Sequence, residues 1–216
     1  MFVGHFAVAF GAKRAAPKVS LGTLFLAAQF LDLLWPTFVV LGIETVRIAP
    51  GITAVTPLEF VSYPWSHSLA AALVWGALFG GVYWRLRRRR LDGVLLGFAV
   101  VSHWLLDFAT HRPDLQLWPG SARRVGLGLW FSLPATLAVE LTLFLAGLWI
   151  YARATRGRDR AGEVGFVVLV GFLLVAYGAA IFGPPPPSVA ALGWGSHSVW
   201  LLVAWGYWLD RHRAAA

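Results

Sequence analysis

The hydrophobic pattern of the chain consists of long apolar runs separated by short polar segments. Several runs approach or reach the roughly 20 residues that a helix needs to cross the hydrocarbon core of a bilayer. The predicted transmembrane helices cover residues 21–41, 67–84, 93–110, 128–151, 164–183 and 195–209. The last run is short, so we expect it to be tilted or only partly inserted. The pattern therefore predicts an all-α, polytopic membrane helix bundle with about six spans.

The first ten residues form an additional apolar segment that is too short to span a bilayer. If this segment is a half-helix that dips in from the inner face, His5 lies about 12 Å deep. No stretch of the chain is polar and long enough to form a separate soluble unit. We therefore expect residues 1–216 to form a single integral membrane domain.

Composition supports this assignment and restricts the chemistry. Of the 216 residues, 58% are hydrophobic and only 13% are charged, and the mean hydropathy is +0.68. There is no cysteine, which excludes disulfides, thiolate nucleophiles and thiolate metal ligands. Any bound metal must be held by nitrogen and oxygen, which suits zinc, manganese, iron or magnesium.

The net charge of +8 could suggest a nucleic-acid partner, but the positions of the basic residues argue against one. If the first spanning helix runs outward, fourteen of the eighteen Lys and Arg residues fall on the inner side. Only four remain outside, namely Arg47, Arg112, Arg123 and Arg124. This asymmetry is what the positive-inside rule produces. It predicts a multi-pass protein of a bacterial-type inner membrane with both termini in the cytoplasm, whose arginine run at 85–90 contacts anionic lipid headgroups.

Ionisable residues within the apolar runs indicate the candidate chemistry. His103, Asp107 and His111 are spaced by four residues, so they lie on one helical stripe, each offset by about 40° from the last. Imidazole and carboxylate groups at this spacing can bind one metal ion or relay protons. Charged groups at membrane depth usually face a bundle interior or a wet cavity, and they mark a functional site by default. The alternative is a cluster that merely satisfies its own hydrogen bonds.

Other polar groups are expected at a similar depth. Counting 1.5 Å per residue places Asp32, His103 and Asp107 about 16 to 22 Å from the inner ends of their helices. His67 opens a helix from the outer side, with Ser66 as its expected cap, and His5 approaches from the N-terminal segment. A structural role remains the alternative for each of these residues. The roles of Glu140 and His197 stay open; Glu140 could support the site or pair with a buried basic group.

Short motifs in the first 120 residues resemble the YdjM-like family of inner-membrane metal-dependent hydrolases. The matching pieces are Gly4-His5, Asp32, Ser66-His67-Ser68, the stretch from Ser102-His103 through Asp107 to Thr110, and Trp118-Pro119. Residues 121–216 add further transmembrane helices. The chain also departs from the pattern: the usual Asp-x-Asp-His cluster is reduced to Leu31-Asp32-Leu33-Leu34, and Tyr63-Pro64-Trp65 stands where Arg-Gly often precedes the histidine motif. Fewer carboxylates favour one metal ion over two.

Residue chemistry and resemblance together predict a membrane-embedded hydrolase that acts on a lipid or lipid-linked ester or phosphoester. We expect a divalent ion, zinc before manganese, iron or magnesium, held by His5, His67, His103 and Asp107. Asp32 or His111 would serve as general base, and Arg112, Arg123 or Arg124 would orient a phosphate. Two alternatives remain open: a proton- or metal-coupled transporter that uses the same cluster, and a non-catalytic membrane scaffold whose polar groups join its helices.

Overall fold

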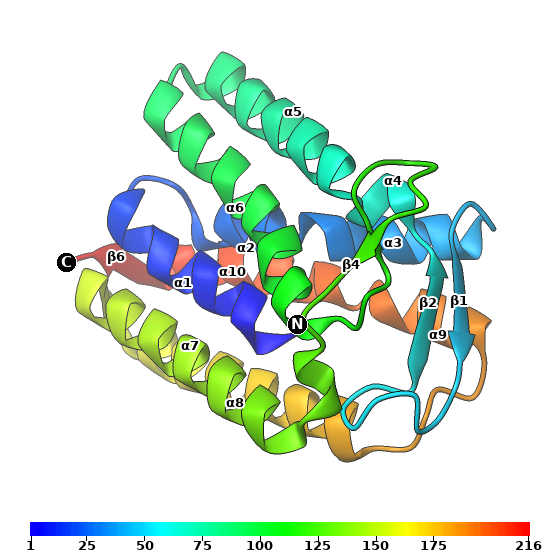
Figure 1. The fold of residues 1–216 in the computed structure, drawn as a ribbon. Helices are drawn as coiled ribbons and strands as arrows, with labels where there is room; N and C mark the ends of the chain where they lie inside the picture. The colour runs from blue at the N-terminus through cyan, green and yellow to red at the C-terminus, as the bar shows by residue number, and fades with distance from the viewer.

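Four helices of the computed structural model, which describes residues 1–216, are long and apolar enough to cross a membrane (Figure 1). They are α5 (Leu69–Arg87), α6 (Arg90–Thr110), α7 (Leu133–Ala154) and α8 (Arg160–Phe182). These helices correspond to the predicted spans at 67–84, 93–110, 128–151 and 164–183. The first of them begins later than predicted, because the cap is Ser68 Oγ, which accepts from Ala71 N at 3.1 Å, and not Ser66.

The predicted span at 21–41 is two helices, α2 (Leu21–Ala28) and α3 (Phe30–Val40), bent by 55° at Gln29. The pair forms either one broken span or a re-entrant loop. Neither proline nor glycine lies at the break, so the apolar pattern could not reveal it. Its consequence is local: the last carbonyl groups of α2 and the first turn of α3 are free to contact other elements.

The predicted span at 195–209 is also divided. It corresponds to α9 (Val189–Ser196) and α10 (Val199–His212), of 8 and 14 residues. The structure thus contains four helices of membrane-spanning length, or five if the bent pair counts as one span, and six spans are not confirmed. The α10 helix packs closely on α2, where a Cβ atom on Gly206 would lie 2.9 Å from the backbone of Gly22. The two glycines make this close approach sterically allowed.

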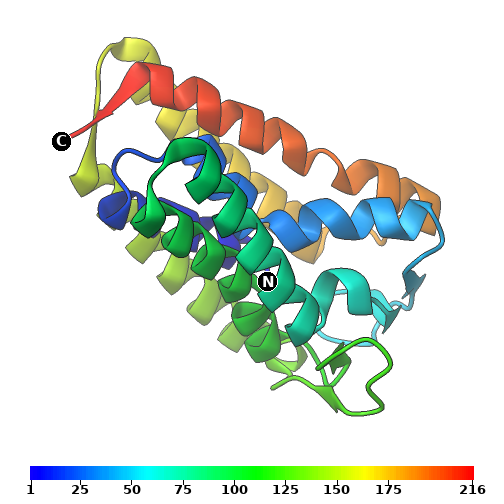
Figure 2. The same ribbon diagram turned by 90° about the horizontal axis from the view of Figure 1, so that it is seen from above.

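The N-terminal segment forms α1 (Val3–Ala15), a helix of 13 residues that begins in the middle of the molecule (Figures 1 and 2). It is short, as predicted, but it continues past the apolar segment to Lys13 and Arg14 in its last turn. It packs on α7, where a Cβ on Gly147 would lie 2.4 Å from the carbonyl oxygen of Ala7. α1 also packs on α6, where the ring of His5 stacks on that of His103.

Three small two-stranded antiparallel sheets, which the all-α prediction did not include, lie between the helices, and the first two of them are hairpins. They pair β1 (Thr45–Ile48) with β2 (Leu58–Ser62), β3 (Leu115–Gln116) with β4 (Arg124–Val125), and β5 (Thr155–Gly157) with β6 (Arg213–Ala215). A short helix, α4 (Pro64–His67), follows β2, and a 3₁₀ turn, η1 (Leu129–Phe131), precedes α7. The first two hairpins carry the loops that surround the candidate site.

Most of the basic residues lie at the end of the bundle that is remote from the β1–β2 hairpin. Figures 1 and 2 show the α5–α6 turn, the α7–α8 connection and the C-terminus at this end, away from the β1–β2 hairpin. These are the segments that carry the arginines at 85–90, 153–160 and 211–213. The separation of charge agrees with the sequence pattern, while the cytoplasmic position of the termini stays a prediction.

The hydrophobic core lies around α1 and α2. Phe6 and Phe10 of α1 pack edge-on against Phe25 of α2, with ring centroids 5.0 and 5.2 Å apart. By contrast, the outer faces of α5 and α8 carry exposed large apolar residues such as Val82 and Val175. Such faces are typical of helices surrounded by lipid. The polar cluster lies where the ends of α1 and α6 meet.

Candidate metal centre

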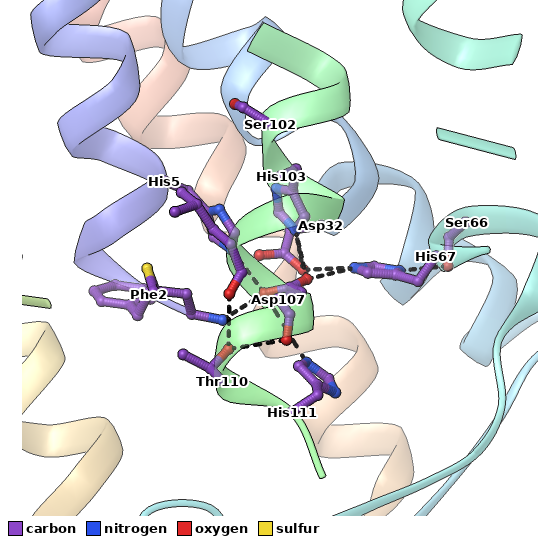
Figure 3. Close-up of polar contacts among 12 residues, drawn as sticks. Phe2, His5, Asp32, Ser66, His67, Ser102, His103, Asp107, Thr110 and His111 are labelled. Carbon is purple, nitrogen blue, oxygen red and sulfur yellow. Dashed lines mark hydrogen bonds and ion pairs between the residues drawn. The ribbon is translucent and has the colours of Figure 1, made fainter. Parts of the chain in front are cut away.

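Asp107, on α6, lies at the centre of a buried polar cluster (Figure 3). Its Oδ1 is 3.1 Å from His5 Nε2, and its Oδ2 is 3.3 Å from His103 Nε2 and 3.7 Å from His67 Nε2. The three imidazoles come from α1, α6 and α4, and none of their side chains is more than 5% exposed. The structure therefore brings together the four residues that the sequence predicts as metal ligands.

Asp32 approaches the same cluster from the first turn of α3. Its Oδ1 is 3.4 Å from His67 Nε2 and 3.6 Å from His103 Nε2. The break at Gln29 creates this helix N-terminus, where the helix dipole stabilises a carboxylate. The Asp32 side chain is 34% exposed, in contrast to 3% for Asp107. Asp32 is thus the accessible acid of the cluster.

The hydrogen bond of His103 fixes its orientation. His103 Nδ1 lies 2.7 Å from the carbonyl oxygen of Ala28, the last residue of α2. A carbonyl only accepts, so Nδ1 carries a proton and Nε2 is the nitrogen directed at the cluster. That Nε2 atom is buried and has no hydrogen-bond partner. An orphaned basic nitrogen facing two carboxylates is what a metal ligand offers before the ion is bound.

His67 is oriented by a two-step relay. Ser66 Oγ donates to Glu44 Oε2 at 2.6 Å, which uses the one hydroxyl proton. The 2.7 Å contact between Ser66 Oγ and His67 Nδ1 then requires the proton to be on Nδ1. Glu44 Oε1 also accepts from the backbone N–H groups of Trp65 and Ser66, both at 2.8 Å, so the acid anchors α4. His67 consequently presents Nε2 to the cluster.

His111 follows the last turn of α6, and, as in His67, its Nδ1 is bonded to a neighbouring side chain while its Nε2 faces the cluster. Its Nδ1 is 3.0 Å from Asp114 Oδ1, which also accepts from the Tyr63 hydroxyl at 2.6 Å. Its Nε2 points at Asp107, with 4.0 Å to Oδ1. Burial lowers the pKa of His111, and burial together with the charge of Asp114 raises the pKa of Tyr63 well above its usual value. The imidazole is therefore neutral, and the phenol keeps its proton.

The N-terminal residues are held against the cluster by Glu140 of α7. Its Oε2 accepts from the backbone N–H groups of Phe2 at 2.9 Å and Gly4 at 3.4 Å, which satisfies unpaired donors at the start of α1. The His5 ring stacks on His103 with centroids 3.6 Å apart, and the Met1 amino group lies 2.6 Å from Asp107 Oδ1. Glu140, whose role the sequence left open, thus supports α1 and contacts no histidine.

The donor set fits one divalent ion. Two overlapping groups of residues each have their ligand atoms within 4.8 Å of one another. The first group is His5, His103 and Asp107, and the second is Asp32, His67 and His103. Zinc bonds of about 2.0–2.1 Å in a tetrahedron place neighbouring ligand atoms about 3.3–3.4 Å apart. Four pairs of atoms among Asp32, His67, His103 and Asp107 are separated by 3.3 to 3.7 Å. Only small side-chain movements are needed for them to enclose an ion.

A cavity of about 210 Å³ opens beside the cluster. Asp32, His67, Asp107 and His111 line it, whereas His5 and His103 lie behind them. Most of the remaining wall is apolar or aromatic. Both residues predicted as general base, Asp32 and His111, therefore line the cavity beside the cluster.

The three arginines that the sequence predicts as phosphate-binding do not line this cavity. Arg112 pairs with Asp114 Oδ2 at 3.1 Å and Glu59 Oε1 at 3.4 Å, and Arg124 donates to the carbonyl oxygen of Asp114 at 3.2 Å. Arg123 is exposed, and none of the three lines the cavity. Their predicted role in binding phosphate gains no geometric support.

Some of the site lay beyond sequence reasoning. Glu44 and Tyr63 reach the cluster only through the fold around the β1–β2 hairpin, and no spacing links them to His67 or His111. Asp114, three residues after His111, could have been found from its spacing. His197 is remote from the cluster: its Nε2 contacts Thr37 Oγ1 at 3.1 Å and its Nδ1 the carbonyl oxygen of Gly193 at 2.8 Å, which joins α9 to α3.

Comparison with known proteins gives one match. The model of a family described as YdjM inner membrane protein matches residues 2–184. The match extends beyond the first 120 residues, where the sequence motifs lie, and it includes all four helices of membrane-spanning length. No curated protein and no solved structure matches the chain.

Proposed function

The chain belongs to the YdjM inner membrane protein family, and we propose that it is a membrane-embedded, metal-dependent hydrolase of lipid or lipid-linked esters or phosphoesters. One observation carries this proposal. The imidazoles of His67 and His103, whose Nδ1 atoms are engaged by Ser66 and by the carbonyl oxygen of Ala28, point Nε2 at Asp107, beside a cavity that Asp32 also lines. Hydrogen-bonded partners behind each ligand are characteristic of catalytic metal sites.

We assign the ion to His67, His103 and Asp107, with His5 stacked behind them and Asp32 on the cavity side. Zinc suits this set of nitrogen and oxygen donors best. When bound, the ion would polarise the scissile bond and lower the pKa of water in the open position. With Nδ1 engaged by Ser66 and by the carbonyl oxygen of Ala28, His67 and His103 would bind the ion through Nε2, which loses any proton it carries when the ion binds.

Asp32 and His111 are the groups that could accept a proton from water in the cavity. Asp32 is the more exposed of the two, with its carboxylate at the cluster. His111 is neutral and directs Nε2 inward, but its ring is held by Asp114 and Tyr63. Asp32 is therefore the favoured general base, with His111 as the second candidate.

Metal removal tests the proposal directly. The purified protein in detergent micelles is expected to hydrolyse a lipid ester or phosphoester, to lose this activity on dialysis against a chelator, and to regain it with zinc. Hydrolysis requires no sealed bilayer, in contrast to transport. Flux of protons or metal ions across the membrane of proteoliposomes, without any hydrolysis, would indicate a transporter instead. A protein that shows neither hydrolysis nor flux, and that binds no metal, would be a scaffold.

The relay behind His67 offers a finer test. Ser66→Ala removes the acceptor of the Nδ1 proton but leaves Glu44 bonded to the backbone of α4. We expect zinc affinity, measured by competition with a chelating dye, to fall about 10- to 100-fold. Ser102→Ala is the matched control, because Ser102 precedes His103 and bonds only the carbonyl oxygen of Ala99. Equal affinities in the two variants would show that the relay does not orient a ligand.

A further inference from the structure

A second hollow adjoins the cavity beside the cluster. A groove of about 380 Å³ runs between the β1–β2 loop and the end of α8, and it shares five lining residues with the cavity. These shared residues are Val55, Thr56, Leu58, Ala180 and Ile181. The groove therefore lies next to the space from which a ligand would reach Asp32 and His67.

The groove and the cavity differ in charge from a phosphate site. No lysine or arginine side chain lines either of them, and the groove carries no charged side chain at all. The charged side chains of the cavity are the acids Asp32, Asp107 and Glu140, and its Met1 amino group is already paired with Asp107. Phosphate groups are usually bound by arginine, lysine or free N–H groups at a helix start. Here Glu140 already occupies the N–H groups at the start of α1.

We propose that the substrate is an uncharged carboxylic ester of a long aliphatic chain, with its carbonyl beside Asp107 and its chain in the groove. This assignment rests on the proposed hydrolase function and narrows it, since the metal ion alone would have to offset an anionic phosphoester, in a cavity that also holds Asp32, Asp107 and Glu140 and no lysine or arginine. The groove is lined by uncharged residues, mostly Ala, Val, Leu, Ile, Pro and Gly, against which an aliphatic chain can pack.

The reaction balances with water as the only co-substrate. The water oxygen bonds to the carbonyl carbon, and the acyl carbon–oxygen bond breaks. The proton that water gives up passes through Asp32 to the leaving alkoxide, so the products are a fatty acid and an alcohol. Asp32 lines the cavity near both reacting groups, and His111 borders the same space.

Photolabelling tests the ligand class without requiring turnover. The probe is a hexadecanoyl glycerol with a diazirine near the end of its chain, applied to the protein in nanodiscs. We expect the labelled peptides to contain residues 50–58 and 179–186. Two competitors are compared, an uncharged hexadecyl glycerol ether and hexadecyl phosphate. The ether should suppress labelling at a concentration at least tenfold lower than the concentration of hexadecyl phosphate that has the same effect. Labels elsewhere, or equal competition by the phosphate, would overturn the proposal.

Two variants that narrow the groove from opposite walls sharpen the result. Ala180→Trp and Thr56→Trp should each reduce labelling at least tenfold, while Val175→Trp, on the exposed face of α8, should leave it unchanged. Elution as a single species on size exclusion verifies folding. Labelling that is insensitive to both groove variants would contradict the assignment.

Hydrolysis of the same ester by zinc-loaded protein is measured separately. If the probe labels the expected peptides but the protein cleaves neither the ester nor the phosphoester, the hydrolase function is refuted and the assigned ligand class is retained. Cleavage of the phosphoester in preference to the ester would refute the ligand class alone.

Discussion

Replacing Asp107 by alanine is expected to reduce bound zinc from about one ion per chain to less than a tenth, and hydrolysis by at least about 1000-fold. Asp107 is the residue on which the cluster converges: both of its oxygen atoms face imidazole nitrogens, from three different helices. Its removal leaves those imidazoles without the carboxylate that would join them in binding an ion. Elemental analysis of the purified protein measures the first effect, and a lipid ester assay the second.

Asp92→Ala provides the matched control for this experiment. Asp92 lies in the first turn of the same helix and pairs with Arg89 at 3.2 Å, at the end of the bundle remote from the cluster. This variant should keep its zinc and its activity. An Asp107→Ala protein that is folded and still holds one zinc would show that the ion, and the reaction assigned to it, belong elsewhere.

The central part of the cluster could be predicted because it depends on local geometry. Four-residue spacing on a helix is sufficient to place His103 and Asp107 on one face, and the cost of ionisable groups at membrane depth identifies them as unusual. The same reasoning places Asp32 and His67 at a similar depth. In the structure these side chains meet within hydrogen-bonding or ion-pairing distance.

The parts that could not be predicted depend on breaks inside apolar sequence. Hydrophobicity marks residues 21–41 as one segment, yet the bend at Gln29 both frees the carbonyl of Ala28 for His103 and turns Asp32 into the first turn of a new helix. A continuous helix would pair that carbonyl internally. The orientation of His103 therefore depends on an irregularity to which neither composition nor periodicity gives a signal.

The groups behind the ligands were unpredictable for a different reason. Glu44 and Tyr63 are brought to His67 and His111 by the β1–β2 hairpin, whose register no apolar pattern specifies. The outer arginines illustrate the converse case: their charge suggested a phosphate site, but Asp114 and Glu59 engage Arg112. Pairing within the fold, which sequence does not display, decides which charges remain for a ligand.

Asp32→Asn is expected to separate proton transfer from metal binding. Asparagine keeps the shape of the side chain and an oxygen donor but cannot accept a proton, so we expect zinc content to stay near one per chain while kcat falls about 100- to 10,000-fold. The exposure of Asp32, 34% in contrast to 3% for Asp107, favours a group that meets solvent and substrate over one committed to holding an ion. Parallel measurement of zinc and kcat in one preparation gives the answer.

His111→Gln distinguishes the two candidate bases under the same conditions. If Asp32 is the base, this variant loses less activity than Asp32→Asn, because His111 contributes only to the wall of the cavity and to the network of Asp114 and Tyr63. The reverse order would assign proton transfer to the imidazole. Loss of zinc from Asp32→Asn would instead make Asp32 a ligand. The tetrahedron of Asp32, His67, His103 and Asp107 would then be complete, and the ion would have a structural role with no position left for water.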